Sequence, residues 1–104
     1  MTEAKWPFSD VVRWLRTKSE SLNTPGATVE LDVQEVGRAT IRLRIERGGL
    51  LGEVTIWGGG AAHMAIVNLQ SGEFVFERDD VYIDDSTIDA EFREFFDRMG
   101  EAES

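Results

Sequence analysis

The chain has 104 residues, a net charge of −9 and no cysteine. This length predicts one domain over residues 1–104, with 1–6 and 100–104 as mobile termini, and the lack of cysteine excludes disulfides and thiolate metal sites. No apolar run is long enough to cross a membrane, and the N-terminus lacks the apolar region of a signal peptide. We therefore expect a cytoplasmic protein that has no membrane partner.

The negative charge is concentrated in the last third of the chain. Residues 1–72 contain 8 acidic and 8 basic side chains, whereas residues 73–104 contain 12 acidic side chains and 3 arginines. An excess of this kind repels nucleic acid and anionic membranes and attracts a basic partner. It also favours solubility, so the charge alone does not establish a binding surface.

An apolar stripe with a period of 3.6 residues predicts a helix from Pro7 to about Asn23, with Trp14 at the rim of the stripe. Strict alternation of apolar and charged residues then predicts strands over 28–33 and 40–46. Pairing Val33 with Ile41 gathers the apolar residues on one face. It also sets acidic residues of the first strand opposite arginines of the second, and leaves a three-residue loop at 36–38.

Three further strands are separated by turns at Gly48-Gly49, at Gly58-Gly59-Gly60 and at Gln70–Glu73. A last helix is predicted from Ser86 to Met99, with Gly100 as its C-terminal stop. The apolar stripe of this helix consists of Ile88, Phe92, Phe95, Phe96 and Met99. The predicted fold is α+β: an antiparallel five-stranded meander sheet with an N-terminal and a C-terminal helix.

The glycine-rich stretch precedes His63, the single histidine of the chain. Gly58-Gly59-Gly60 lacks the Lys and Ser/Thr of a phosphate-binding loop and the spacing of a dinucleotide-binding loop, so we interpret it as a β-turn. One histidine without cysteine does not make a typical zinc site, which favours a structural role for His63. We expect neither a metal nor a cofactor.

Trp57 alternates out of phase with Val54 and Ile56, which places it on the face that carries Arg42 and Arg44. A bulge that turns Trp57 inward, or a local contact with an arginine, would give it a structural role. As an exposed aromatic side chain it would instead anchor a partner, because tryptophan is enriched at interface hot spots.

The segment "RDDVYIDD" (78–85) concentrates four aspartates without the spacing of an EF-hand. Two carboxylates that meet in space can act as general acid and base, which leaves a carboxylate-based enzyme as an alternative. There is no nucleophile elbow and no cysteine nucleophile. The segment is also suited to contact a basic protein.

The spacing Gly52-x-x-x-x-Trp57-x-x-Gly60 is followed by an apolar strand, a Ser71-Gly72-Glu73 turn and an acidic, aromatic helix. Over roughly residues 50–98 this pattern resembles the TriTu group of immunity proteins, which belong to bacterial polymorphic toxin systems. The resemblance implies a small cytoplasmic protein that binds and neutralises a toxin domain and has no assigned catalytic residues. The motif positions that it carries over are Gly52, Trp57, Gly60 and Gly72.

We therefore predict an immunity protein, not an enzyme, which binds a cognate basic toxin through an acidic surface and does not bind nucleic acid. The predicted partner-binding residues are Asp79, Asp80, Asp84, Asp85, Glu94, Asp97 and Trp57. Two alternatives stay open: a small carboxylate-based enzyme or ligand-binding domain, and a DNA mimic whose acidic surface copies phosphate spacing.

Overall fold

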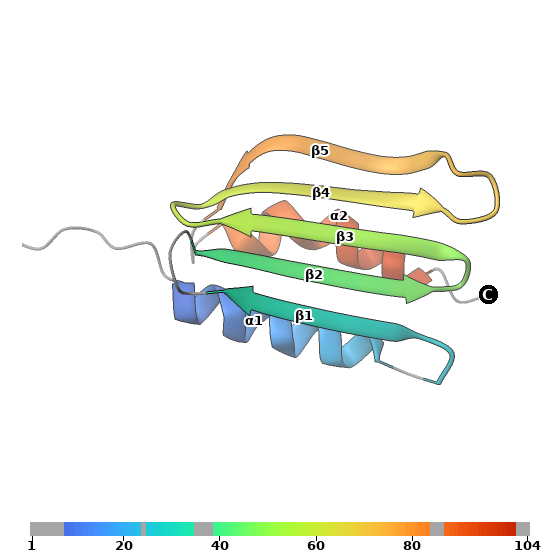
Figure 1. Ribbon diagram of the computed structural model, residues 1–104, viewed down its shortest axis with the longest axis horizontal. Coiled ribbons are helices and arrows are strands. Elements are labelled where there is room, and N and C mark those ends of the chain that lie inside the picture. The colour runs from blue at the N-terminus through green and yellow to red at the C-terminus, as the bar shows by residue number, and fades with distance from the viewer. Residues whose placement is uncertain (1–7, 24, 35–38, 84–86, 102–104) are drawn as a thin grey trace, which may run out of the picture.

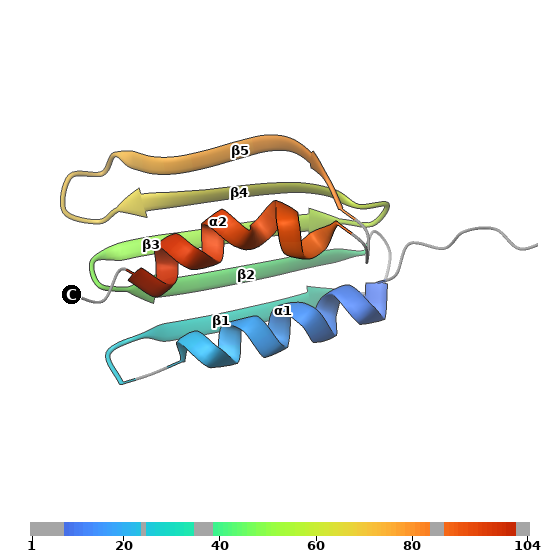
Figure 2. The same cartoon turned by 180° about the vertical axis from the view of Figure 1, so that it is seen from behind.

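The computed structural model describes residues 8–23, 25–34, 39–83 and 87–101. Its elements are α1 (Phe8–Leu22), β1 (Thr28–Gln34), β2 (Thr40–Arg47), β3 (Leu50–Trp57), β4 (Ala61–Asn68), β5 (Phe74–Tyr82) and α2 (Ile88–Glu101). The strands form one antiparallel sheet in the order β1-β2-β3-β4-β5. Both helices lie on the same face of this sheet (Figures 1 and 2), which confirms the predicted α+β meander. Among the described residues, no helix is both long and apolar enough to span a bilayer.

The register of β1 against β2 is the predicted one. Val33 pairs with Ile41, and Asp32 pairs with Arg42 on the opposite face of the sheet. The loop predicted at 36–38 lies outside the described residues. The next turn, Gly48-Gly49, has φ angles of 59° and 81°, a region that glycine enters without steric cost. The hairpin therefore depends on glycine at these two positions.

The core lies between the sheet and the two helices. α1 contributes Val11 and Leu15, and α2 contributes Phe92, Phe95 and Met99, all of them at most 1% exposed. The strands supply alternate residues of the facing side: Ile41, Leu43, Ile45, Val54, Ile56, Ala62, Met64, Ile66 and Val81. The apolar side chains that recur every 3.6 residues in the helices and every 2.0 residues in the strands thus pack together in one layer.

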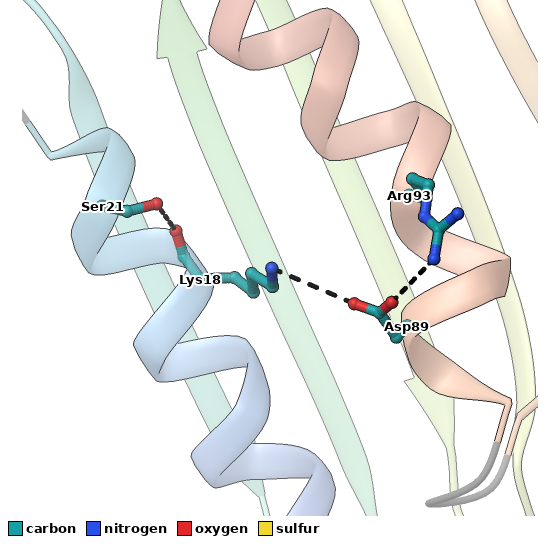
Figure 3. A network of polar contacts seen from close by, with 4 residues as sticks. All are labelled: Lys18, Ser21, Asp89 and Arg93. Atoms are coloured by element: carbon teal, nitrogen blue, oxygen red, sulfur yellow. Dashed lines mark hydrogen bonds and ion pairs between the residues drawn. The ribbon is translucent and has the colours of Figure 1, made fainter.

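Trp14 joins the two helices at the edge of this layer. Its ring centroid lies 5.9 Å from that of Phe92 and 5.6 Å from that of Phe96. Figure 3 shows Lys18 reaching from α1 toward Asp89, with Nζ and Oδ1 4.0 Å apart. An exposed pair at that distance contributes little, so the aromatic contacts set the helix packing.

The C-terminal stop predicted at Gly100 is wrong. α2 continues through Gly100 to Glu101. The guanidinium of Arg47, at the end of β2, donates hydrogen bonds to the carbonyl oxygens of Met99 and Gly100 at 3.2 and 3.0 Å. These bonds satisfy carbonyl groups that a glycine in the left-handed conformation would otherwise help to satisfy. The capping residue predicted at Ser86 lies outside the described residues.

Gly52 allows α2 to approach β3 closely. A Cβ atom at this position would lie 2.8 Å from Cζ of Phe95 and 2.9 Å from Sδ of Met99, closer than real Cβ contacts occur. Both side chains are fully buried, so neither can move away without disturbing the core. A side chain at position 52 would therefore push the helix off the sheet.

We expect Gly52→Ala to lower the free energy of unfolding by about 1–3 kcal/mol, because the added methyl group overpacks the core. Urea denaturation followed by circular dichroism measures the change. Gly58→Ala is the matched control, since a Cβ there would meet its nearest neighbour at 3.4 Å. Equal stability of the two variants would contradict the close approach.

Candidate functional site

One face of the sheet carries no helix, and we call it the open face (Figure 1). Alternate strand residues point to it, as the pairing of Asp32 with Arg42 and of Arg44 with Glu53 requires. Its principal side chains are Glu30, Asp32, Arg42, Arg44, Glu46, Glu53, Thr55, Trp57, His63, Glu77, Asp79 and Tyr82. The candidate functional surface is this face, because nothing in the described chain covers it.

The open face also carries the excess negative charge. Among the described side chains it holds six carboxylates and two arginines, a difference of four negative charges. The two helices hold seven carboxylates and five lysines or arginines, and Arg47 and Arg78 reach α2 from the sheet. The helix side is therefore close to neutral, although most of the acidic excess in the sequence lies in the last third.

Over β1–β3 the open face forms a hollow of about 420 Å³. Its charged lining alternates in sign: Glu30 and Asp32 on β1, Arg42 and Arg44 on β2, and Glu53 on β3. The Nε atom of Arg44 lies 3.2 Å from Oε2 of Glu53, and both side chains are more than half exposed. The arginines of β2 thus stand between the carboxylates of β1 and the carboxylate of β3.

On the β4–β5 side, His63 lies between two carboxylates. Its Nε2 atom is 3.4 Å from Oε2 of Glu77 and 3.3 Å from Oδ1 of Asp79. A bulge beside this position shifts the pairing of β4 with β5. The three ligand atoms lie within 4.8 Å of one another, close enough to hold a divalent cation. A hydrogen bond between the His63 imidazole and Glu77 also joins β4 to β5 at this position without an ion.

Trp57 projects onto the open face at the end of β3 and is 38% exposed. The interpretation in which a bulge turns it inward is wrong. The turn after it is the predicted one: Gly59 and Gly60 have φ angles of 99° and 103°, and the Gly60 N–H donates to the Trp57 carbonyl at 3.0 Å. The glycines therefore form the hairpin turn, while Trp57 stays in contact with solvent.

The structure divides the predicted partner-binding residues between the two sides of the sheet. Asp79 and Trp57 lie on the open face. Glu94 and Asp97 are exposed on α2, which lies on the other side, and Glu94 pairs with Arg98 at 2.7 Å. Of the remaining residues, Asp80 belongs to β5, and Asp84 and Asp85 fall outside the described residues. One flat interface cannot contain both groups.

Sequence reasoning missed several open-face residues, of which Tyr82 and Glu77 are the most relevant. Tyr82 is 71% exposed and pairs with Ala61 across β4 and β5. Glu77 pairs with Ala65 on the same face. The alternation within β5 could not reveal them, because its pairing with β4 shifts at two places.

A family model described as immunity protein TriTu matches residues 9–98. The chain belongs to this family. The match begins in α1, ends in α2 and includes all five strands, so it is wider than the segment 50–98 that carried the sequence resemblance. No match is found among curated proteins or among solved structures.

The motif positions of the TriTu resemblance divide into two kinds. Gly52 permits the close packing of α2, and Gly60 and Gly72 have φ angles of 103° and 76° that their turns require. Each glycine is thus explained by the fold. Trp57 is not, because its side chain lies on the open face and contributes nothing to the buried core.

We expect Trp57→Ala to lower the free energy of unfolding by about 1 kcal/mol or less, since surface substitutions have small effects. Trp14→Ala should cost about 3 kcal/mol, because it removes a ring packed against Phe92 and Phe96. Thermal and urea unfolding of the two variants measure the difference. A loss at Trp57 as large as that at Trp14 would show that Trp57 serves the fold.

Proposed function

We propose that this TriTu family member neutralises its cognate toxin by binding a basic domain of it through the acidic open face, without catalysis. The observation that carries the proposal is that, among the described side chains, the excess negative charge lies on the face that no helix covers. Membership of an immunity protein family supports a toxin as the partner. The complex is proposed to form in the cytoplasm, with the chain acting as a single domain.

Electrostatic attraction gives this surface a clear physical role. A negative face raises the rate at which an oppositely charged protein arrives and orients it before contact. Arg42 and Arg44 interrupt the negative charge at the centre of the face, and such a mixed pattern discriminates against partners whose charges do not match it. A DNA mimic needs uninterrupted negative charge, so the two arginines count against that alternative.

We include Asp79 in the binding surface, and we extend the proposal to Asp80, Asp84 and Asp85, which belong to the same segment of the sequence, 78–85. We exclude Glu94 and Asp97, because α2 lies on the opposite side of the sheet. The inhibitory mechanism is then steric and electrostatic: the bound protein covers a basic surface that the toxin needs for its own activity.

Co-expression with the toxin encoded by the adjacent gene tests the function directly. Cells should survive, and the two proteins should purify as a stoichiometric complex. The proposal fails if the cells die and no complex forms. A DNA mimic would bind several unrelated DNA-binding proteins, so a panel of such proteins separates that alternative from an immunity protein.

Charge reversal on the two sides of the sheet tests the location of the interface. Asp79→Lys should slow association with the toxin roughly three- to tenfold at low ionic strength and weaken its salt dependence. Asp97→Lys makes the same charge change on α2 and should alter the rate by less than about twofold. Stopped-flow measurements over a range of salt concentrations compare them. A larger effect of Asp97→Lys would move the interface to the helices.

A further inference from the structure

Two aromatic side chains flank a small residue at the β3–β4 hairpin end of the open face. Ala61 pairs with Tyr82 on β5. On its other side Ala61 adjoins Trp57 of β3. Ile56 pairs with Ala62, and the same antiparallel register places Trp57 next to Ala61. Neighbouring strands are about 4.8 Å apart, so the backbones of Trp57 and Tyr82 are separated by roughly 10 Å. Only the methyl group of Ala61 stands between the two aromatic side chains on this face.

Both rings are free to contact a partner. Trp57 is 38% and Tyr82 is 71% exposed. Among the described residues, neither ring stacks on another aromatic ring or on a cation; the ring contacts of the chain lie on the helix side. Large aromatic side chains with an exposed face and a preset position are typical anchors of protein interfaces.

The surroundings of these two rings are acidic. Glu77 and Asp79 lie on the open face of β5, on the same strand as Tyr82. Their nearest described counter-group is His63, which contacts both. The described arginines of the open face, Arg42 and Arg44, are on β2, where they pair with acidic residues of β1. A positively charged side chain from a partner would therefore balance the carboxylates on the β4–β5 side of the open face.

We propose that Trp57, Ala61 and Tyr82 form a slot for one arginine or lysine side chain of the toxin. This inference rests on the proposed function and names the partner group that the surface recognises. A cation packs favourably against the faces of Trp and Tyr, and a planar guanidinium fits between two rings. The methyl group of Ala61 contacts the aliphatic stem, and the carboxylates of Glu77 and Asp79 attract the charge.

Other occupants fit the surface less well. A purely apolar side chain would leave the adjacent carboxylates with His63 as their one described partner as the interface lost water, which costs free energy. A second copy of the chain would bring two negatively charged faces together, and their repulsion opposes that contact. The combination of aromatic rings with neighbouring carboxylates therefore points to a cation.

Substitutions at Ala61 fill the slot without removing either ring. Ala61→Arg places a guanidinium where the toxin side chain would lie, and binding should weaken at least about tenfold. Ala61→Glu has a similar volume but the opposite charge, and it should weaken binding less, because it can pair with the incoming cation. Calorimetry with the purified toxin domain measures both affinities.

Ala90→Arg is the matched control, because Ala90 is an exposed alanine on α2. It should bind the toxin as the wild-type protein does, and circular dichroism checks that each variant is folded. The slot is refuted if Ala61→Arg binds like Ala90→Arg. Equal losses for Ala61→Arg and Ala61→Glu would refute its preference for a cation. Failure of the wild-type protein to bind would instead refute the proposed function, so the two outcomes are distinguishable.

Tyr82 offers a second measurement that does not alter the hairpin. Tyr82→Ala should accelerate dissociation from the toxin while leaving the association rate within about twofold, because the ring acts after contact and carries no charge. Tyr82→Phe keeps the ring and should retain most of the affinity. Unchanged dissociation of Tyr82→Ala would also refute the slot.

Discussion

Both helices lie on one face of the five-stranded sheet, and the rest of the structure follows from that arrangement. The apolar alternate residues of the strands turn toward α1 and α2, and the other half of each strand must then be stable in water. Cross-strand pairing of acidic residues with Arg42 and Arg44 meets this requirement over β1–β3. The open face is therefore a consequence of the topology, and its charge is partly a condition of folding.

The close packing of α2 depends on the same layer. Gly52 brings Phe95 and Met99 down onto β3, and Arg47 satisfies the carbonyl groups at the end of the helix. With α2 held so firmly against one face, its carboxylates are directed away from the open face. Arg78 reaches Glu91 from β5 at 3.1 Å, and Lys18 lies near Asp89. These long-range contacts neutralise the helix side.

Local patterns were enough to predict most of the fold. Alternation in β1 and β2 gave their register, because a shift by one residue would have placed leucine against arginine. Glycine clusters gave the turns, and the 3.6-residue stripe gave both helices. The end of α2 was missed because its cap is Arg47, 52 positions away in the sequence, and no local pattern records such a contact.

The candidate site was harder to predict, for reasons that β5 illustrates. Val81 faces the core with Ala62, yet Arg78 pairs with core-facing Met64, so no single alternation describes this strand. The bulge that reconciles them is what places Asp79 on the open face. The sequence also could not show on which side of the sheet the acidic groups of residues 73–104 lie, because that depends on the docking of α2.

Trp57 links the fold to the proposed function. Its alternation predicted the open face correctly, and the structure supplies what the sequence lacked, namely Tyr82 on the far side of Ala61. In the proposed complex, charge and aromatic surface have separate parts: long-range attraction controls how fast a partner arrives, whereas short-range packing controls how long it stays. A protein that must stop a toxin before it acts needs both properties on one surface. The open face combines them because the fold leaves it uncovered.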